Sequence, residues 1–307
     1  MFSKCRKVRF IVLLLMAYSA TWRAQESPPA APAVRQRLPP TDDPKEIIRR
    51  ALDVDQSSFQ LARNYTYEVR DDLKMLDKKG SVKKHEITTY ELTILYDEPY
   101  SRRIRKDDKP LADKEERKEE EKADKFVAER KNESAKEHEK RLAKQEKERQ
   151  EARAFARDII NAYDFRIAGE EQVDGREAYV LDAIPRRDFH PTQPHADILP
   201  KLRGKIWISK KDYGCVRLEA ETTDTISLGL FLVRIRKGTQ IRLEQTRVND
   251  EIWLPRRLFI NASARVALFA NDAINLESTY SNYKKFTSGA RILPGATEVQ
   301  PTADPPR

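Results

Sequence analysis

Four side chains of types that bind metals lie close together between Asp188 and Asp197. His190 and His195 are five residues apart, with Asp188 and Asp197 beside them. Two prolines follow His190 within this segment, and the spacing matches neither the helical nor the hairpin spacing of metal ligands. We therefore expect a surface loop here and no metal site.

Motifs for enzymatic chemistry are missing from the sequence. It contains no GxSxG, HExxH, P-loop, GxGxxG or paired CxxC motif. Acidic residues are abundant, but no pattern singles out a catalytic pair. We therefore expect a protein that is not an enzyme and has no cofactor.

The N-terminus has the pattern of a secretory signal. Residues 1–9 are basic, residues 10–17 are apolar and too few to span a bilayer, and small residues follow at Ala17 and Ser19. We expect a signal peptide over residues 1–24, with an uncleaved membrane anchor as the alternative, and export in either case. Cys5 would leave with the signal, so Cys215 is expected to be a lone thiol.

The net charge gives no indication of a nucleic-acid partner. Removing the five basic residues of the predicted signal peptide lowers the formal charge from +9 to +4. A nucleic-acid-binding chain more often shows a basic face with interleaved aromatic residues, and none stands out. We therefore expect no nucleic acid among the partners.

Composition divides the rest of the chain. A linker rich in proline and alanine covers residues 25–41, and a disordered tail is expected at residues 291–307. Between them, residues 42–290 form one predicted domain. It opens with a helix capped by Thr41-Asp42-Asp43, with Pro44 in its first turn and an apolar stripe that continues to about Asn64.

A charged insertion interrupts this domain at residues 112–162. Residues 113–153 contain 14 Lys and Arg, 14 Asp and Glu, and no Gly or Pro. Pairs such as Glu121/Lys125 support an exposed helix, which would be about 60 Å long if continuous. We expect it to protrude from the domain, with disorder or a partner-binding arm as alternatives. Its apolar end, residues 152–163, is expected to pack back onto the domain.

The other segments alternate between apolar and charged residues with period two. The pattern is clearest in Val216 to Glu221 and in Ile241 to Glu244, and turn residues such as Lys237-Gly238 separate the runs. Nine to eleven strands with few helices predict a mainly β (α+β) fold. We expect a large curved antiparallel sheet with an N-terminal helix.

The concave face of such a sheet must be filled with core or occupied by a ligand. Either way it would carry the apolar residues of the alternating runs, and an open apolar trough would suit an acyl chain. We expect this trough to consist of Tyr67, Leu92, Ile94, Tyr179, Leu181, Ile206, Ile208, Val216, Leu218, Val233, Ile241, Leu243, Leu254 and Leu258.

Three segments carry a resemblance to a known family. They are Gly175 to Leu181, the strand Gly204 to Ser209 ending in Trp207-Ile-Ser, and Asn249 to Pro255 with its Trp253-Leu-Pro triplet. Together they resemble the periplasmic outer-membrane lipoprotein-sorting superfamily, the LolA/LolB/RseB-like fold, with Ser209 in place of the usual Asp. The resemblance implies an unclosed β-barrel whose apolar concave face binds lipid or lipoprotein acyl groups. The charged insertion departs from the compact carriers of this family.

Two functions follow as hypotheses. The first is a periplasmic envelope protein of a Gram-negative-type bacterium that holds a lipid or a lipidated protein in the trough. Basic residues such as Arg102, Arg103 and Arg186 would meet anionic head groups in a peripheral membrane contact. The alternative is a sensor or scaffold that binds an envelope protein through the charged helix.

Overall fold

The computed structural model describes residues 41–77, 79–96, 98–193, 195–228, 233–266 and 269–286. The predicted signal peptide and the predicted tail lie outside these ranges, as does the predicted linker apart from Thr41. Among the helices of the described ranges, none is long and apolar enough to cross a membrane.

The first described helix, α2 (Pro44–Ala62), begins where the sequence predicts. The side chain of Asp43 accepts a hydrogen bond of 3.0 Å from the backbone N–H of Lys45. Pro44 occupies the first turn, where its missing N–H removes no intrahelical bond. Ile47 and Ile48 are buried, so this apolar stripe is the face that packs on the rest of the domain.

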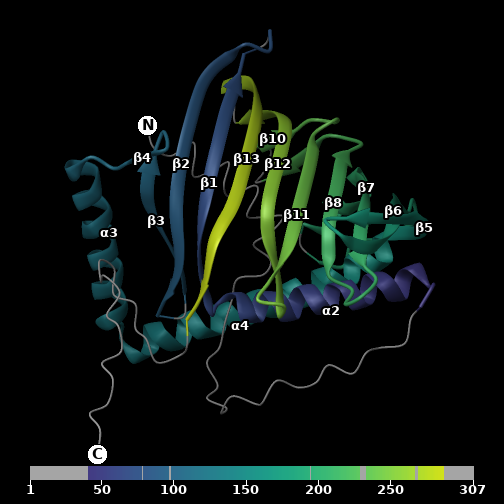
Figure 1. Cartoon of the computed structure of the whole chain (residues 1–307), viewed down its shortest axis with the longest axis horizontal. Helices are drawn as coiled ribbons and strands as arrows, with labels where there is room; N and C mark the ends of the chain where they lie inside the picture. Colours follow the sequence, from purple (N-terminus) through teal and green to yellow (C-terminus); the bar gives the residue numbers. More distant parts are fainter. Residues whose placement is uncertain are drawn as a thin grey trace, which may run out of the picture.

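The described strands form one antiparallel sheet (Figure 1). Eleven of its 13 described strands follow one path, β4-β3-β2-β1-β13-β12-β11-β8-β7-β6-β5, and β9 and β10 pair beside it. Their bounds are β1 (Tyr65–Leu76), β2 (Val82–Leu95), β3 (Glu98–Lys106), β4 (Lys109–Pro110), β5 (Tyr163–Val173), β6 (Arg176–Pro185), β7 (Leu202–Ser209), β8 (Cys215–Thr222), β9 (Ile226–Leu228), β10 (Val233–Ile235), β11 (Gln240–Val248), β12 (Ile252–Val266) and β13 (Phe269–Lys285).

This sheet confirms the predicted fold class. Its path ends at β4 and β5, and in the described chain β4 pairs only with β3 and β5 only with β6. The sheet is therefore curved but not closed into a barrel (Figure 1).

A β-bulge in β8 overturns one detail of the predicted alternation. The sequence pattern places Val216 and Leu218 on the same face. In the structure the register between β7 and β8 shifts between Trp207 and Ile208, and Val216 is the extra residue. Val216 packs in the cluster that contains Trp207. Leu218 lies opposite Ile206, on the other face.

The charged insertion forms two helices, α3 (Asp113–Lys131) and α4 (Ala135–Ala162), and not one continuous helix. Between them, Ser134 and Glu137 form a capping box: the Ser134 N–H donates to the Glu137 carboxylate at 3.0 Å and the Glu137 N–H donates to Ser134 Oγ at 3.3 Å. The Ser-x-x-Glu spacing of Ser134 and Glu137 is the sequence signal for this helix start. The prediction of a single insertion helix missed it because the charge pattern continues without a break across residues 113–153.

The expectation that this insertion protrudes from the domain is wrong. In α3, Ala123 is fully buried, the ring of Phe126 lies 5.1 Å from that of Tyr100, and Arg130 donates to Glu98 at 2.8 Å. Figure 1 shows α3 beside β3 and β4, and α4 along the foot of the sheet near α2. Ion pairs and one apolar contact thus dock α3 on the sheet, although its hydrophobic stripe is narrow.

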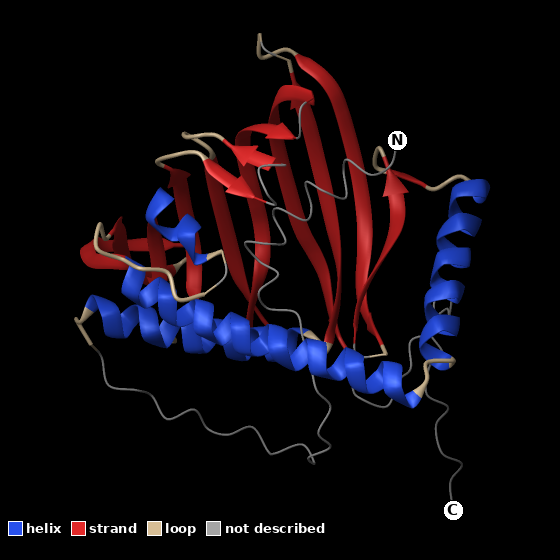
Figure 2. Cartoon of the chain, turned by 180° about the vertical axis from the view of Figure 1, so that it is seen from behind, coloured by secondary structure: helices blue, strands red, loops and turns tan. Residues whose placement is uncertain are grey.

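The apolar end of α4 packs back on the domain, as predicted. Phe155, Ile159 and Ile160 contact a buried cluster that includes Ile47 of α2 and Leu181 of β6. Figure 2 shows α2 and α4 crossing the same side of the sheet close to its foot, while β1, β2, β12 and β13 extend well beyond them. The two helices therefore cover only part of that face.

Candidate functional site

Five of the predicted trough residues form one continuous row across the sheet. Leu181 lies opposite Ile206, Ile206 opposite Leu218, Leu218 opposite Leu243, and Leu243 opposite Leu258. Residues directly opposite each other on neighbouring strands project from the same face. The row therefore joins β6 to β12 with an unbroken apolar line.

The first end of the row belongs to a helix-covered cluster. Here Leu181 and Ile208 are buried against Ile47, Ile48 and Ala51 of α2. The buried members of this helix-covered cluster are Ile47, Ile48, Ala51, Ala162, Tyr163, Phe165, Tyr179, Leu181, Ala183, Ala196, Leu199, Ile208 and Tyr213.

The second end of the row belongs to a cluster that contains strand residues alone. Leu258 is buried there, and Leu243 and Ile241 are half-buried. No residue of a described helix takes part in this strand-only cluster, whose members are Leu73, Ile241, Leu243, Leu258, Ile260, Ala262, Ile274, Leu276 and Tyr280. A sheet face of this kind normally packs against another layer.

Leu218 connects the two clusters. It is half-buried and belongs to neither, but it stands between Ile206, which packs on the helix-covered cluster, and Leu243, which packs on the strand-only cluster. The apolar face is therefore continuous from the part under the helices to the part formed by strands alone.

The remaining predicted residues lie around this row. Tyr179 is in the helix-covered cluster, whereas Leu254 packs with Tyr65 and Ile252 at the end of β12. Leu92 and Ile94 are half-buried on β2. Val233 lies in β10, and its side chain is outside the described set.

Three tyrosines extend the face across β1 and β13. The ring of Tyr67 lies 5.2 Å from that of Tyr283 and 6.3 Å from that of Tyr280, and all three are half-buried. Removal from water raises the pKa of Tyr67. Tyr280 and Tyr283 were not among the predicted trough residues, although Leu276 and Tyr280 continue the period-two pattern of β13.

One carboxylate lies on the sheet-facing stripe of α2. Ile48, Ala51 and Ser58 mark that stripe and are buried, and the helical spacing places Asp55 on it as well. Asp55 itself is exposed. The surrounding protein raises the pKa of its carboxyl group, and the side chain of Gln245 opposes the rise. Asp55 was not among the predicted site residues, because those residues were chosen for their apolar side chains.

Cys215 lies near this carboxylate and is free, as predicted. Burial raises the pKa of its thiol to about 12, and the charge of Asp55 adds to the rise. Because the thiolate is the nucleophilic form, a thiol with this pKa is unreactive at neutral pH. Cys215 therefore acts as a small packing residue beside the helix-covered cluster.

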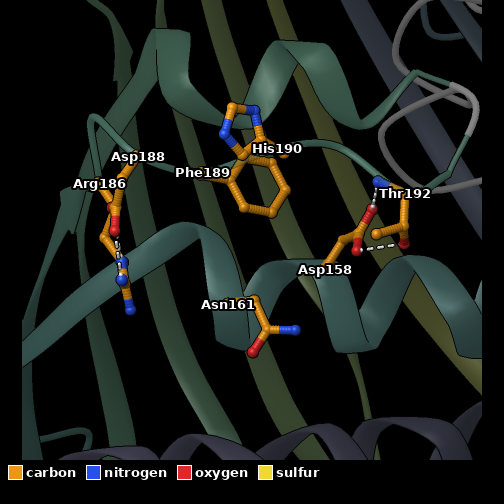
Figure 3. Close-up of a pocket in the computed structure, with 7 residues that line it drawn as sticks. All are labelled: Asp158, Asn161, Arg186, Asp188, Phe189, His190 and Thr192. Carbon is orange, nitrogen blue, oxygen red and sulfur yellow. Dashed lines mark hydrogen bonds and ion pairs between the residues drawn. The ribbon is translucent and has the colours of Figure 1, made fainter.

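The predicted histidine loop borders an open pocket of about 280 Å³. In Figure 3, Asp158 of α4 points at Thr192, whose N–H and hydroxyl donate to it at 2.9 and 2.7 Å. Arg186 donates to Asp188 at 2.7 Å, and His190 is exposed. The carboxylates thus hold the loop in place, and the pKa of Asp188 is lowered first by Arg186 and, to a smaller extent, by the charge of His190.

The structure describes no metal centre. Among the residues it describes, no group of three or more His, Cys, Asp or Glu side chains is placed to hold a metal ion. His195 adopts a left-handed conformation, with a φ of 65°, at the start of a short 3-10 helix, η2 (Ala196–Lys201). The segment is therefore a turn into η2, in agreement with the loop that the sequence predicts.

The arginines considered for head-group binding are engaged in ion pairs. Arg102 lies 3.6 Å from Glu116, and Arg103 lies 3.4 Å from Glu115. These contacts hold α3 against β3, and the pairing of Arg186 with Asp188 serves the histidine loop in the same way. Such residues have a structural role, which weakens the case for them as a membrane-binding patch.

Comparison with known proteins gives similarity to solved structures only. No family model matches the chain, and no curated protein matches it. A DUF1329 family protein from Desulfovibrio piger is 11% identical, with a TM-score of 0.31 over 81% of this chain and 96% of that one. A LolA superfamily protein from Nitrosomonas europaea is 10% identical, with a TM-score of 0.26 over 82% and 94%.

The MucA/MucB complex of Pseudomonas aeruginosa is also similar, at 10% identity and a TM-score of 0.23, covering 78% of this chain and 94% of that one.

Proposed function

We propose that this chain is an exported, non-enzymatic envelope protein that binds the acyl chain of a lipid or lipoprotein along the apolar row from Leu181 to Leu258. The observation that carries the proposal is the continuity of the row, which runs from beneath α2 into the strand-only cluster. An acyl chain lying along it would gain about 0.8 kcal/mol for each methylene removed from water.

The predicted signal peptide supports the location, and the resemblance to lipoprotein-sorting proteins supports the ligand class. The site residues support a binding role: the Cys215 thiol is protonated at neutral pH, and Asp158 is bonded to Thr192 rather than to a histidine. The half-buried residues Leu218, Leu243 and Ile241 are the expected points of contact with the ligand.

The first experiment is native mass spectrometry of the protein purified from a bacterial periplasm without detergent. We expect an additional mass of the size of a lipid or an acyl group, which extraction with organic solvent removes. A clean ligand-free mass from a cooperatively folded protein would contradict the proposal and indicate that the row is ordinary core.

A second candidate is a sensor or scaffold that binds an envelope protein through the charged helices. The exposure of Lys144 and Lys147, with side chains 76% and 77% accessible, favours it because α4 keeps a charged surface although α3 is docked. Reversing these two charges leaves the sheet untouched. Loss of a co-purifying protein with retention of bound lipid would favour the scaffold.

A further inference from the structure

The apolar row from Leu181 to Leu258 continues beyond Leu258 as a row of polar side chains. Leu258 lies opposite Ser278 of β13, and Ser278 lies opposite Asp71 of β1. Asp71 in turn lies opposite Thr88 of β2. Because directly opposite residues project from the same face, one line across the sheet changes from apolar to polar between β12 and β13.

A hydrogen bond fixes the carboxylate of this polar end. Ser278 Oγ donates to Asp71 Oδ1 at 2.7 Å. Leu73, two residues after Asp71 on β1, is a buried member of the strand-only cluster, so the period of the strand places Asp71 on the same face. Ser278 is 4% accessible, whereas Asp71 is half-buried. The carboxylate, which can accept more than one hydrogen bond, is therefore the group that a ligand reaches.

Three tyrosine rings lie beside this polar end. Tyr280 follows Ser278 by two residues on β13 and packs on the strand-only cluster. The ring of Tyr67 lies 6.3 Å from that of Tyr280 and 5.2 Å from that of Tyr283, which are the separations of aromatic rings in contact. The rings therefore form a continuous aromatic surface, with no gap of the size of a quaternary ammonium group between Tyr67 and its neighbours.

The polar end carries charges of both signs. Beyond Asp71 and Thr88 the line reaches β3 at Lys106, which lies opposite Thr88 and is exposed. An anionic head group would be repelled by Asp71, and a cationic head group would be repelled by Lys106. A hydroxyl group donates to a carboxylate without a charge of its own. The polar end is therefore suited to an uncharged head group with several hydroxyls.

We propose that Asp71 receives the head group of the bound amphiphile and that this head group is a neutral polyol, a sugar or a glycerol. Its hydroxyls donate to Asp71, and its carbon face lies on the tyrosine rings. The inference rests on the proposed function, since the acyl chain would lie along Leu218 and Leu243. Ligand sites commonly combine an apolar lining with a few polar groups that fix the orientation of the ligand. Here they direct the tail toward the helices and the head toward β1.

The test is the affinity of the periplasmic protein for decyl glucoside, 1-decanoylglycerol, decanoate and decyltrimethylammonium, measured by calorimetry below their critical micelle concentrations. The four probes share a chain length and differ in the head group. We expect a neutral probe to bind about tenfold more tightly than either ion. Whichever neutral probe binds more tightly identifies the polyol as a sugar or a glycerol, and either result supports the proposal.

Asp71→Asn should abolish the preference over decanoate, because the variant lacks the charge that repels the anion and accepts hydroxyl donors less strongly. The matched control is Asp72→Asn. Asp72 is the next residue of β1 and projects from the opposite face, so this variant should retain the preference.

Each other outcome contradicts a defined part of the reasoning. Equal or tighter binding of decanoate or decyltrimethylammonium by the natural protein would overturn the neutral head group and leave the acyl-binding function in place, and this comparison needs no variant. A preference that persists in folded Asp71→Asn would overturn Asp71 as the site of the head group. Failure of all four probes to bind would overturn the proposed function, and the head-group site with it.

Discussion

Leu218 of β8 lies directly opposite Leu243 of β11, and neither side chain is fully buried. This pair is the point at which the apolar face leaves the helix-covered cluster and enters the strand-only cluster. A charge placed at either position can reach water, whereas one placed at Leu258, which is 2% accessible, cannot.

We therefore expect Leu218→Glu and Leu243→Glu to lose the co-purifying amphiphile and to keep a cooperative thermal transition. Leu258→Glu should unfold the domain, because a buried unpaired charge costs more than about 4 kcal/mol. Native mass spectrometry and circular dichroism give the two readouts. Ile184→Glu, at a site 39% accessible, is the neutral control. Unfolding of the first two variants would assign these residues to the core.

Asp55→Asn should stabilise the protein at neutral pH. The folded-state pKa of Asp55 is raised by desolvation, so folding disfavours its charged form. The cost is present in full above the raised pKa and is lost as the pH falls from there to the unfolded value near 3.8. The variant should therefore melt at a higher temperature at pH 8 and at the same temperature as the natural protein in acid. A lower melting temperature at pH 8 would show that the carboxylate stabilises the fold.

Glu133 lies in the turn between α3 and α4 and makes the stability of this turn depend on pH in acid. The hydrogen bonds from Arg141 lower the pKa of Glu133 to about 2, against its desolvation and with help from His138. Because the pKa of Glu133 is lower in the folded state than in the unfolded state, the ionised carboxylate stabilises the fold at pH values above the unfolded pKa of about 4.5. This stabilisation is lost as the pH falls from 4.5 to about 2. Glu133→Gln should cost about 1 kcal/mol at pH 7 and remove this part of the acid dependence. Glu139→Gln, at an exposed site, should change neither the stability at pH 7 nor its dependence on acid pH. If Glu133→Gln loses stability in acid in the same way as the natural protein, Glu133 is not the group responsible.

Ala123→Glu should release α3 from the sheet edge. Ala123 is fully buried, and β3 is the strand that α3 contacts through Phe126, Glu115 and Glu119. We expect faster hydrogen exchange in α3 and proteolytic cleavage near Ser134, with the remaining sheet still folded. Ala143→Glu, at an exposed site on α4, is the control. Unchanged protection of α3 would mean that its ion pairs alone hold it in place.

Tyr65→Phe should destabilise the base of the sheet. The hydroxyl of Tyr65 donates to Glu251 at 2.6 Å and accepts from Asn249 at 2.9 Å, and the ring is 1% accessible. Removing the hydroxyl leaves a partly buried carboxylate with one donor fewer, which costs about 1–3 kcal/mol. Denaturant titration would measure this loss, with Tyr96→Phe at an exposed site as the control. A difference below a few tenths of a kcal/mol would show that water replaces the hydroxyl.

Local sequence determined the elements of this protein. Asp43 and Pro44 start α2, the Asp174-Gly175 pair turns β5 into β6 with positive φ at both residues, and period-two alternation marks the strands. Such signals act between residues close in the chain, where backbone geometry and capping bonds depend on few neighbours. For that reason the large curved antiparallel sheet could be predicted, whereas the register that places Leu181 to Leu258 in one row came from the structure.

The tertiary structure alone decided how these elements meet. Arg130 binds Glu98 and so docks a helix whose composition suggests a protruding arm. The bulge places Val216 on the face opposite to that of Leu218, and Asp55 is exposed although Ala51 and Ser58 on the same stripe of α2 are buried. These outcomes depend on packing between segments far apart in the chain, which no local pattern encodes. The same packing determined which part of the apolar face lies under the described helices and which part contains only strand residues in the described ranges.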